Sequence, residues 1–289
     1  MQQHITQYRM KALCEALAVS RSGYRSWLYR PVNRYKLAFR EAVSTCYLAQ
    51  KARAGAPSIA AEIQARGYNV SVRTVGRMMR SLGLRARGCR KFKCTTDSNH
   101  KYGASPNLLE RQFTVTRPNQ VWVGDITYIR TDEGWLYLAV LLDLYSRQVV
   151  GWQMSARIDR QLVCDALQAA ILTRDKPEGV MVHSDQGVQY ASKDYRSLIT
   201  QYQLTQSMSR RGNCWDNAVA ESFFATLKKQ VVYGERFLTR HKAQQAIFEY
   251  IECYYNRIRR HSTNGWLSPV DYEAAYYNNI EGESVHLID

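Results

Sequence analysis

The chain has 289 residues, of which 45% are hydrophobic and 22% charged, and its mean hydropathy is −0.44. These values are typical of a globular protein of about two domains and exclude a fibrous or intrinsically disordered chain. No apolar run reaches the roughly 18 residues that a membrane-spanning helix needs, and the first ten residues lack the apolar core of a signal peptide. We therefore expect a cytoplasmic protein that has no membrane partner.

The net charge of +15 is confined to the front of the chain. Residues 1–110 hold 20 Lys and Arg against 5 Asp and Glu, whereas residues 111–289 hold 20 of each sign. Clustered Lys and Arg favour a polyanionic partner, because each phosphate that they neutralise releases a condensed counterion. The alternative, a solubilising surface, normally mixes both signs. The distribution thus indicates that the front part binds nucleic acid.

Two short helix-turn-helix units are predicted in this front part. In residues 10–29 the apolar spacing indicates two helices, and the Ser20 hydroxyl can cap the second. In residues 56–84 a first helix opens at a Pro-Ser pair and a second starts at Ser71. The domains assigned on this basis are a helix-turn-helix-like segment, 1–35, and a second, DNA-binding module, 36–88.

The second helix of that module carries Arg73, Arg77 and Arg80. Their spacing places them near one face of the helix. Such a face can enter the major groove of DNA, or it can be a solvated row of charges. Because it lies in the segment that holds the net charge, we predict that the three arginines contact DNA.

Residues 89–112 are interpreted as a basic linker, because the stretch from residue 84 to 101 is basic and polar without a sustained period. Cys89 and Cys94, with His100 nearby, form the one cysteine pair whose spacing suggests zinc. No second ligand pair follows at zinc-finger spacing, so plain thiols are favoured. Seven cysteines, odd in number and mostly far apart, indicate a reducing compartment.

The sequence pattern changes to strands after residue 118. Aromatic and β-branched runs predict three strands joined by short turns, hence an antiparallel meander. A helix, a short buried strand and a second helix follow, which indicates an α/β domain over residues 113–276. The predicted elements are strands at 120–130, 135–145, 148–154 and 180–182 and helices at 160–173 and 191–202.

Three acids are prominent in this domain. Asp125 interrupts the first strand, where a charge is costly unless it is paired or binds a metal. Asp185 follows the strand at 180–182, and the carboxyl ends of such strands face the crevice of α/β sheets. Glu221 lies on a helix beside an apolar stripe. Each has an ordinary alternative, namely a bulge cap, an Asx-turn residue and a surface ion pair respectively.

The three acids converge on one end of the predicted sheet, and carboxylates that meet without cations repel one another. Hard oxygen ligands suit Mg²⁺, with Mn²⁺ as a substitute. Two such ions roughly 3.5–4 Å apart can activate an attacking oxygen and stabilise the departing one at phosphorus. The pattern therefore predicts a metal site for phosphodiester chemistry at Asp125, Asp185 and Glu221.

The chain resembles the second-reading-frame transposases of the insertion-sequence-three family, within the retroviral-integrase and RNase H-like superfamily. The 35 residues between Asp185 and Glu221 match the spacing of that superfamily's aspartate-aspartate-glutamate motif. The resemblance covers nearly the whole chain. It is carried by WVGDITYI (122–129), HSDQGVQYAS (183–192), GNCWDNAVAESFFATLK (212–228) and YYNRIRRHSTNGWLSPVDYE (254–273).

The resemblance implies an RNase H-like integrase core, a mixed five-stranded sheet with helices, preceded by helix-turn-helix modules. It implies a transposase that frees a 3′-hydroxyl at the end of an insertion sequence and joins it to target DNA. Asp125, Asp185 and Glu221 would hold the catalytic metals, and Lys228 would contact DNA near the scissile phosphate. The implied partners are terminal inverted repeats, target DNA, further copies of the chain and a first-reading-frame product or frameshift fusion, in the bacterial nucleoid.

Other polar residues are weighed beside this set. Asp143 also ends a strand, but the motif assigns it no metal. His183 is either a hydrogen-bonding neighbour of the metal site or a polar strand-end residue. We expect Asn213, Trp215 and Asn217 to shape the approach to Glu221, with Trp215 as a core residue in the alternative. The closing motif is expected to pack on the catalytic domain: Tyr255, Asn256, Arg257, Arg260, His261, Ser268 and Pro269.

Two competing functions remain open from sequence. A DNA-binding regulator with an inactive nuclease-like domain would bind DNA without metal-dependent cleavage, although all three acids are intact. A structure-selective nuclease of the same fold would hydrolyse DNA without joining strands. Asn264, Gly265 and Trp266 depart from the small or glycine-rich turn that the family more often has there. The chain also lacks a leucine-heptad region, so its capacity to multimerise alone is open.

Overall fold

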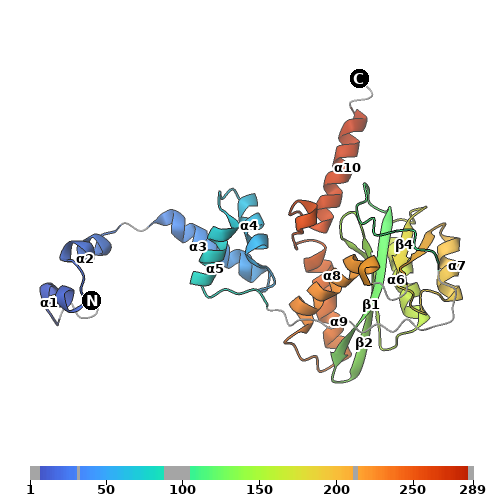
Figure 1. Ribbon diagram of the computed structural model, residues 1–289, viewed down its shortest axis with the longest axis horizontal. Helices are drawn as coiled ribbons and strands as arrows, with labels where there is room; N and C mark the ends of the chain where they lie inside the picture. The colour runs from blue at the N-terminus through green and yellow to red at the C-terminus, as the bar shows by residue number, and fades with distance from the viewer. Residues whose placement is uncertain (1–6, 31–32, 88–104, 211–213, 286–289) are drawn as a thin grey trace. The chain divides into compact units, whose positions relative to one another are not determined.

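A computed structural model describes residues 7–30, 33–87, 105–210 and 214–285, with the side chains of 214, 215 and 281–285 left out (Figure 1). The chain divides into two compact units, Met1–Val43 and Ser44–Asp289. None of the described helices combines the length and apolarity that a bilayer crossing requires. The domain boundaries drawn from sequence stay predictions.

The first unit contains two short helices, α1 (Met10–Ala16) and α2 (Arg21–Leu28), and the first part of α3 (Arg34–Ala49). The Ser20 side chain accepts a hydrogen bond from the Gly23 amide at 2.9 Å, which satisfies one of the free amides at the start of α2. The two helices and the Ser20 cap predicted from sequence are confirmed. The long helix α3, which crosses the boundary between the units, was not predicted.

The second unit begins with the end of α3, then α4 (Ala56–Ala65) and α5 (Val72–Ser81). Ser71 caps α5 by accepting a hydrogen bond from the Thr74 amide at 3.2 Å, as its sequence position predicted. The apolar sides of α4 and α5 are buried. They contribute Ile59, Ile63, Val75 and Met79 to the interior.

A five-stranded mixed sheet forms the centre of the second unit, in the order β3-β2-β1-β4-β5. The first three strands form the predicted antiparallel meander, and β4 and β5 add in parallel on the other side of β1. The mixed five-stranded sheet expected from sequence is therefore confirmed. Its strands are β1 (Val121–Thr131), β2 (Gly134–Asp143), β3 (Val149–Ser155), β4 (Met181–Ser184) and β5 (Thr205–Met208).

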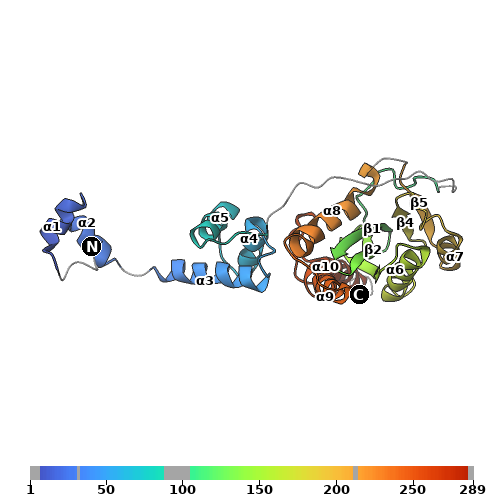
Figure 2. The same ribbon diagram turned by 90° about the horizontal axis from the view of Figure 1, so that it is seen from below.

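Helices cover both faces of the sheet and divide the core in two. Figure 2 shows α6 and α7 on one side of the strands and α8 and α9 on the other. Each side has its own cluster of buried apolar residues, centred on α6 or on α8. The helical segments of this domain are α6 (Arg160–Thr173), α7 (Lys193–Gln201), η2 (Cys214–Asn217), α8 (Ala218–Leu227), η3 (Lys228–Val232), α9 (Arg240–Phe248), η4 (Glu249–Tyr255), η5 (Ser262–Asn264) and α10 (Pro269–Val285).

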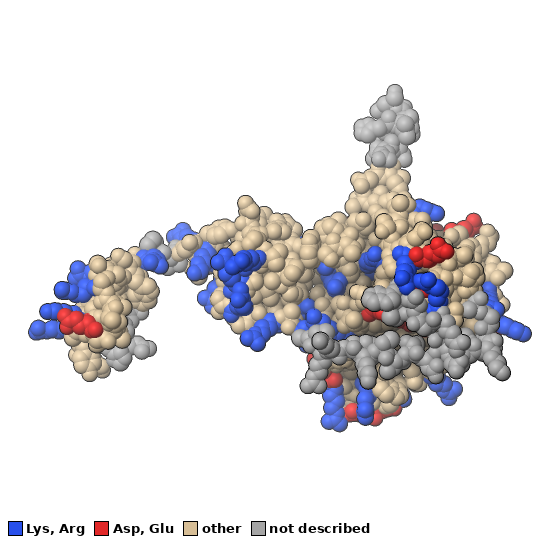
Figure 3. Space-filling view, viewed as in Figure 1, with Lys and Arg blue, Asp and Glu red and all other residues tan. Residues whose placement is uncertain are grey.

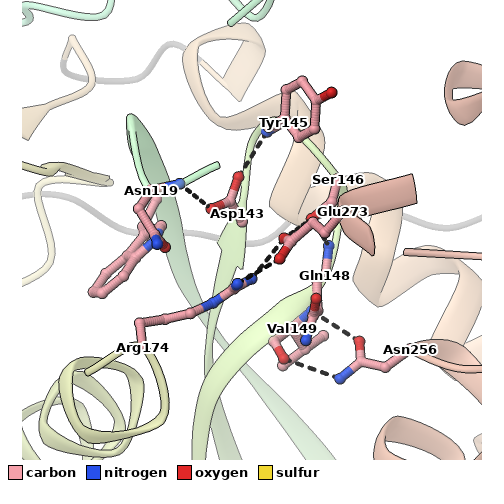
Figure 4. Close-up of polar contacts among 10 residues, drawn as sticks. Asn119, Asp143, Tyr145, Ser146, Gln148, Val149, Arg174, Asn256 and Glu273 are labelled. Carbon is pink, nitrogen blue, oxygen red and sulfur yellow. Dashed lines mark hydrogen bonds and ion pairs between the residues drawn. The ribbon is translucent and has the colours of Figure 1, made fainter. Parts of the chain in front are cut away.

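The C-terminal segment is fixed to the turn between β2 and β3 by side-chain hydrogen bonds (Figure 4). The Asn256 side chain accepts from the Val149 amide and donates to the Val149 carbonyl, both at 3.0 Å. Glu273 on α10 accepts from Arg174 and from the Ser146 hydroxyl. These contacts bury Asn256 and Glu273 with their polar groups satisfied. The expected packing of the closing motif on the catalytic domain is thus confirmed for Asn256.

Gly151 on β3 allows α6 to approach the sheet. A Cβ atom at this position would lie 2.4 Å from the Ala166 carbonyl oxygen and 2.6 Å from the Ala170 Cβ. These neighbours are helix backbone and a buried methyl group, so they cannot move aside cheaply.

We predict that Gly151→Ala lowers the free energy of unfolding by about 1–3 kcal/mol, because the added methyl group overpacks the contact between β3 and α6. Urea-induced unfolding followed by circular dichroism measures the change. Gly76→Ala is the matched control, since its new Cβ meets only the Ala56 Cβ at 3.5 Å. Alanine is favoured over glycine in a helix by about 1 kcal/mol, so the control protein should be at least as stable as the wild type. Equal stability of Gly151→Ala and wild type would contradict the prediction.

Candidate active site

Asp125 lies on β1 just beyond the residues that pair with β4. The parallel pairing with β4 covers only Val121, Trp122 and Val123, so the remainder of β1 has no neighbour on that side. Asp125 is half-buried, and its Oδ1 accepts a hydrogen bond from the Ile126 amide at 2.8 Å. Its side chain is on the same face of β1 as Val123, toward the cluster that contains α8.

Asp185 directly follows β4, the parallel neighbour of β1. Its Oδ1 accepts from the Gly187 amide at 3.0 Å in an Asx turn. A Cβ at Gly187 would lie 2.9 Å from that same oxygen, so glycine permits the close approach. The turn aims the Asp185 carboxylate at the end of the sheet where β4 stops and β1 continues. Asp185 therefore forms the Asx turn that was its ordinary alternative, and it also lies near Asp125.

Glu221 lies in the first turn of α8, which the structure anchors on β1. The Asn217 side chain donates to the Gly124 carbonyl at 3.2 Å, next to Asp125 in the chain. Glu221 itself is exposed, and a carboxylate in a first turn is favoured by the helix dipole. The predicted apolar stripe beside it is buried, which confirms the predicted orientation of the helix. The stripe consists of Ala220, Phe224, Leu227 and Val231.

The three carboxylates act on one another electrostatically. Burial raises the pKa of Asp125 well above its usual range, and the charges of Asp185 and then Glu221 raise it further. The same two aspartates raise the pKa of the buried Tyr190 hydroxyl, after the larger effect of burial. Burial also raises the pKa of Glu221. The structure therefore places Asp185 and Glu221 near enough to act on the charge of Asp125, while the assignment of the three acids to one catalytic site stays a prediction.

The donor set suits a hard divalent cation. Within the described ranges, no three acidic, histidine or cysteine side chains form a ready-made cage around one ion. The site instead offers the oxygens of Asp125, within β1 just beyond its pairing with β4, and of Asp185, directly after β4, with the exposed Glu221 on α8. A cation between the two aspartates would relieve the repulsion that raises the pKa of Asp125.

Lys228 is held beside this site in a buried position. It is 7% exposed, and its Nζ lies 4.8 Å from the centroid of the Tyr128 ring. Burial lowers its pKa, while the charge of Asp125 opposes that shift. The helix winds from α8 into the π-helical η3 at this residue. Lys228 therefore balances charge next to Asp125, whereas its predicted contact with DNA stays a prediction.

Asp216 is a structural residue of the site that the sequence reasoning missed. Its buried carboxylate accepts from Arg111 Nε at 2.8 Å, from Arg210 Nε at 3.0 Å and from the Asn107 amide at 3.0 Å. Arg210 in particular holds the pKa of Asp216 well below its usual range. The contact fixes the start of α8 to residues 107–111, which the sequence assigned to the linker. No pattern around Asp216 separated it from a surface acid.

The structure also shows the surroundings of His183 and Asp143, two other polar residues weighed from sequence. His183 is buried and its Nδ1 lies 2.8 Å from the Ser207 hydroxyl on β5, and burial lowers its pKa to about 4. These contacts support the strand-end alternative for His183. Asp143 accepts hydrogen bonds from the Asn119 and Tyr145 amides, apart from the three acids (Figure 4). The expectations for Cys89, Cys94, His100 and Asn213 and for the Trp215 side chain lie outside the described residues.

The arginines predicted to contact DNA are all exposed. Arg73, Arg77 and Arg80 lie along α5, whose buried side carries Val75 and Met79. Figure 3 shows Lys and Arg but no Asp or Glu on the visible face of the module that contains α5. The face is therefore available to a polyanion.

Comparisons with known proteins agree with this architecture. Family models described as HTH-like domain and Integrase core domain match residues 34–93 and 115–214, and a second Integrase core domain model matches 221–279. The transposase InsF for insertion sequence IS3A of Escherichia coli (strain K12) is 46% identical over 278 residues, which covers 94% of this chain and 96% of that protein. A 31 kDa protein of insertion element IS600 from Shigella sonnei is 40% identical over 92% of this chain and 98% of its own length. The catalytic core domain of HTLV-2 integrase in complex with magnesium is similar at 17% identity and a TM-score of 0.42, over 54% of this chain and 97% of that one.

The integrase core together with a helix-turn-helix-like domain defines a DNA-binding polynucleotidyl transferase. With 46% identity across almost its whole length, the chain belongs to the family of IS3 insertion-sequence transposases. Its activity is therefore DNA strand cleavage and strand transfer in transposition.

We predict that Asp216→Asn lowers the free energy of unfolding at pH 7 by about 1.5–3 kcal/mol, the contribution of hydrogen bonds to a charged group. Because the folded-state pKa of Asp216 is depressed, the stabilisation is complete above the unfolded pKa of about 4 and is lost as pH falls below it. Unfolding measured at pH 7 and near pH 3.5 should therefore show a smaller gap between mutant and wild type at the acidic pH. The control, Asp175→Asn, changes an exposed acid. A pH-independent gap would argue against this role.

Proposed function

We propose that Asp125, Asp185 and Glu221 are the catalytic triad of this transposase and that they bind Mg²⁺, with Mn²⁺ as a substitute. The observation that supports this most strongly is the parallel register of β1 with β4, which sets Asp125 beside Asp185, and the charges of Asp185 and Glu221 add to the effect of burial in raising the pKa of Asp125. Keeping an uncompensated carboxylate out of water costs on the order of several kcal/mol. A cation site explains why such residues occur together at an open sheet edge.

Each residue has a distinct part in the proposed reaction. When bound, divalent metal ions supply an activated attacking oxygen and stabilise the oxygen that leaves. Asp125 on β1 and Asp185 after β4 would hold these ions, which would in turn bind the anionic scissile phosphodiester, and Glu221 would complete the ligand set from α8. Asn217 keeps α8 in register with β1 through the Gly124 carbonyl.

The reaction that fits this site is direct displacement at phosphorus. A water oxygen first forms a bond to the phosphorus at the end of the element, and the bond to the 3′-oxygen breaks, which releases a 3′-hydroxyl. That hydroxyl then forms a bond to a target phosphorus while the target's own 3′-oxygen leaves. No covalent bond to a protein side chain is needed. Lys228 lies beside Asp125, where its charge can also meet the phosphate.

We further propose the DNA partners of the chain. Arg73, Arg77 and Arg80 on α5 contact the phosphates of double-stranded DNA, including the terminal inverted repeats of the element and the target. Synapsis of two element ends requires at least two active sites, so we propose a homo-oligomer on DNA at the bacterial nucleoid. A first-reading-frame product, or a fusion with it, assists in selecting the ends.

We expect Asp125→Asn, Asp185→Asn and Glu221→Gln each to reduce strand cleavage and joining by more than about 100-fold, because each removes an oxygen ligand. Labelled element ends incubated with the purified protein and Mg²⁺ or Mn²⁺ show both products on a gel. Glu178→Gln, which alters an exposed acid, is the control. Wild-type activity in any of the three variants would contradict the assignment of that residue to the catalytic triad. Cleaved but never joined products would instead favour the nuclease alternative.

We expect the triple substitution Arg73→Gln, Arg77→Gln, Arg80→Gln to weaken DNA binding and to flatten its salt dependence. Each lost phosphate contact lowers the slope of log affinity against log salt concentration by about 0.9. Fluorescence anisotropy with a labelled duplex at several salt concentrations measures the slope. Arg157→Gln, an exposed arginine on the loop after β3, is the control. An unchanged slope would show that α5 does not contact DNA phosphates.

A further inference from the structure

A cavity of about 490 Å³ lies within the second unit, between the start of α4, one flank of α8 and the segment after η4. We propose that this cavity, here named the arginine pocket, binds a backbone phosphate of DNA. Four arginines line it, together with one histidine. They are Arg53, Arg147, Arg259, Arg260 and His261.

Two of the four arginines are neutralised by carboxylates. Arg53 donates to both Glu249 oxygens, at 3.2 and 2.7 Å, and Arg260 pairs with Glu62 at 2.7 Å. These pairs join α4 and the residues before it to η4 and to the segment that follows η4. They leave Arg53 and Arg260 as structural residues of the pocket wall.

The other two arginines keep their charge uncompensated. In the part of the chain that the structure describes, neither Arg147 nor Arg259 forms an ion pair with a carboxylate. The Nη1 of Arg147 is buried and has no hydrogen-bond partner there. Burial lowers the pKa of Arg147 and the charge of Asp143 opposes that shift, but the Asp143 oxygens accept hydrogen bonds from the backbone amides of Asn119 and Tyr145. Arg147 also lines the pocket, so the charge of its guanidinium, with which no described carboxylate pairs, favours an anion there.

His261 supplies no compensating negative charge and cannot become a further cation. It is buried, and burial together with the charges of Arg259 and Arg147 lowers its pKa to about 2. Its ring lies against Arg259, whose Nη1 is 2.7 Å from His261 Nε2. The pocket therefore presents two guanidinium groups to an anion.

The remaining lining resembles the donor set that proteins use for DNA backbones. The pocket lining also includes Ser58, Ser222, Thr226 and Ser262, and α4 begins beside it after its N-cap residue Gly55, without a side-chain cap. Phosphate contacts in protein–DNA complexes come from Arg, Ser and Thr side chains and from helix N-termini. A bidentate guanidinium matches the geometry of phosphate.

The position of the pocket connects it with the proposed active site. Ser222 and Thr226 line the pocket from α8, and Glu221 precedes Ser222 on the same helix. DNA held in the pocket would follow the flank of α8 next to the one that presents Glu221. The inference rests on the proposed function, since it concerns DNA bound for strand transfer.

The test compares DNA binding by Arg147→Gln, Arg259→Gln and the double variant with that of the wild type. Binding to a labelled duplex is measured by fluorescence anisotropy over a range of salt concentrations, in EDTA so that catalysis does not contribute. We expect the double variant to lower the salt slope by about 0.9, the value for one phosphate. Its affinity at low salt should fall about tenfold or more. Arg157→Gln, an exposed arginine elsewhere, should match the wild type.

An unchanged salt slope in the folded double variant overturns the proposal. A change in oligomeric state without a change in the salt slope also overturns it, because it would indicate that a carboxylate from a second copy fills the pocket. If the double variant fails to fold, Arg259→Gln alone carries the test, because Arg259 is half-buried at the surface. Asp125→Asn should keep the wild-type slope while it loses strand transfer. If the arginine variants keep both strand transfer and the wild-type salt slope, phosphate binding in the pocket is rejected while the proposed active site is not.

Discussion

The repulsion between Asp125 and Asp185 is the constraint on which the functional part of the structure depends. The parallel register of β1 with β4 places Asp125, within β1, beside Asp185, directly after β4, and burial of Asp125 weakens the screening of its charge by bulk water. Lys228 opposes this repulsion only in part. The cation site that we propose would relieve this repulsion, and it would link the topology of the sheet to phosphodiester chemistry.

A site at an open sheet edge needs support from outside the sheet. Asn217 ties α8 to the Gly124 carbonyl, and Asp216 clamps the residues before α8 through Arg210 and Arg111. After η4, Asn256 completes the turn between β2 and β3. These polar contacts are buried and join segments that are distant in the chain, so they help to fix positions to within the small tolerance that in-line displacement requires.

The charges of the second unit fall into two classes. Arg53 and Arg260 are paired with carboxylates and hold the helical module against the C-terminal segment. Arg147 and Arg259 remain without such partners, as do the exposed arginines of α5 that lie outside ion pairs among the described residues. The arginines that we propose to bind DNA therefore differ from the structural ones in their partners, since a guanidinium paired with a carboxylate has fewer donors left for a phosphate.

The sequence alone determined the strand meander and the caps at Ser20 and Ser71, because periodicity and capping are local signals. It also singled out the three acids of the proposed site, since a charge inside a strand is a local signal too. It missed α3 and the clamp at Asp216, and it gave no reason to expect Lys228 to be buried. Those features depend on which segments meet: 105 residues separate Asp216 from Arg111 in the chain, and their contact exists only once the sheet has formed. Tertiary structure alone decided which charges are neutralised, because pairing across such separations leaves no local pattern.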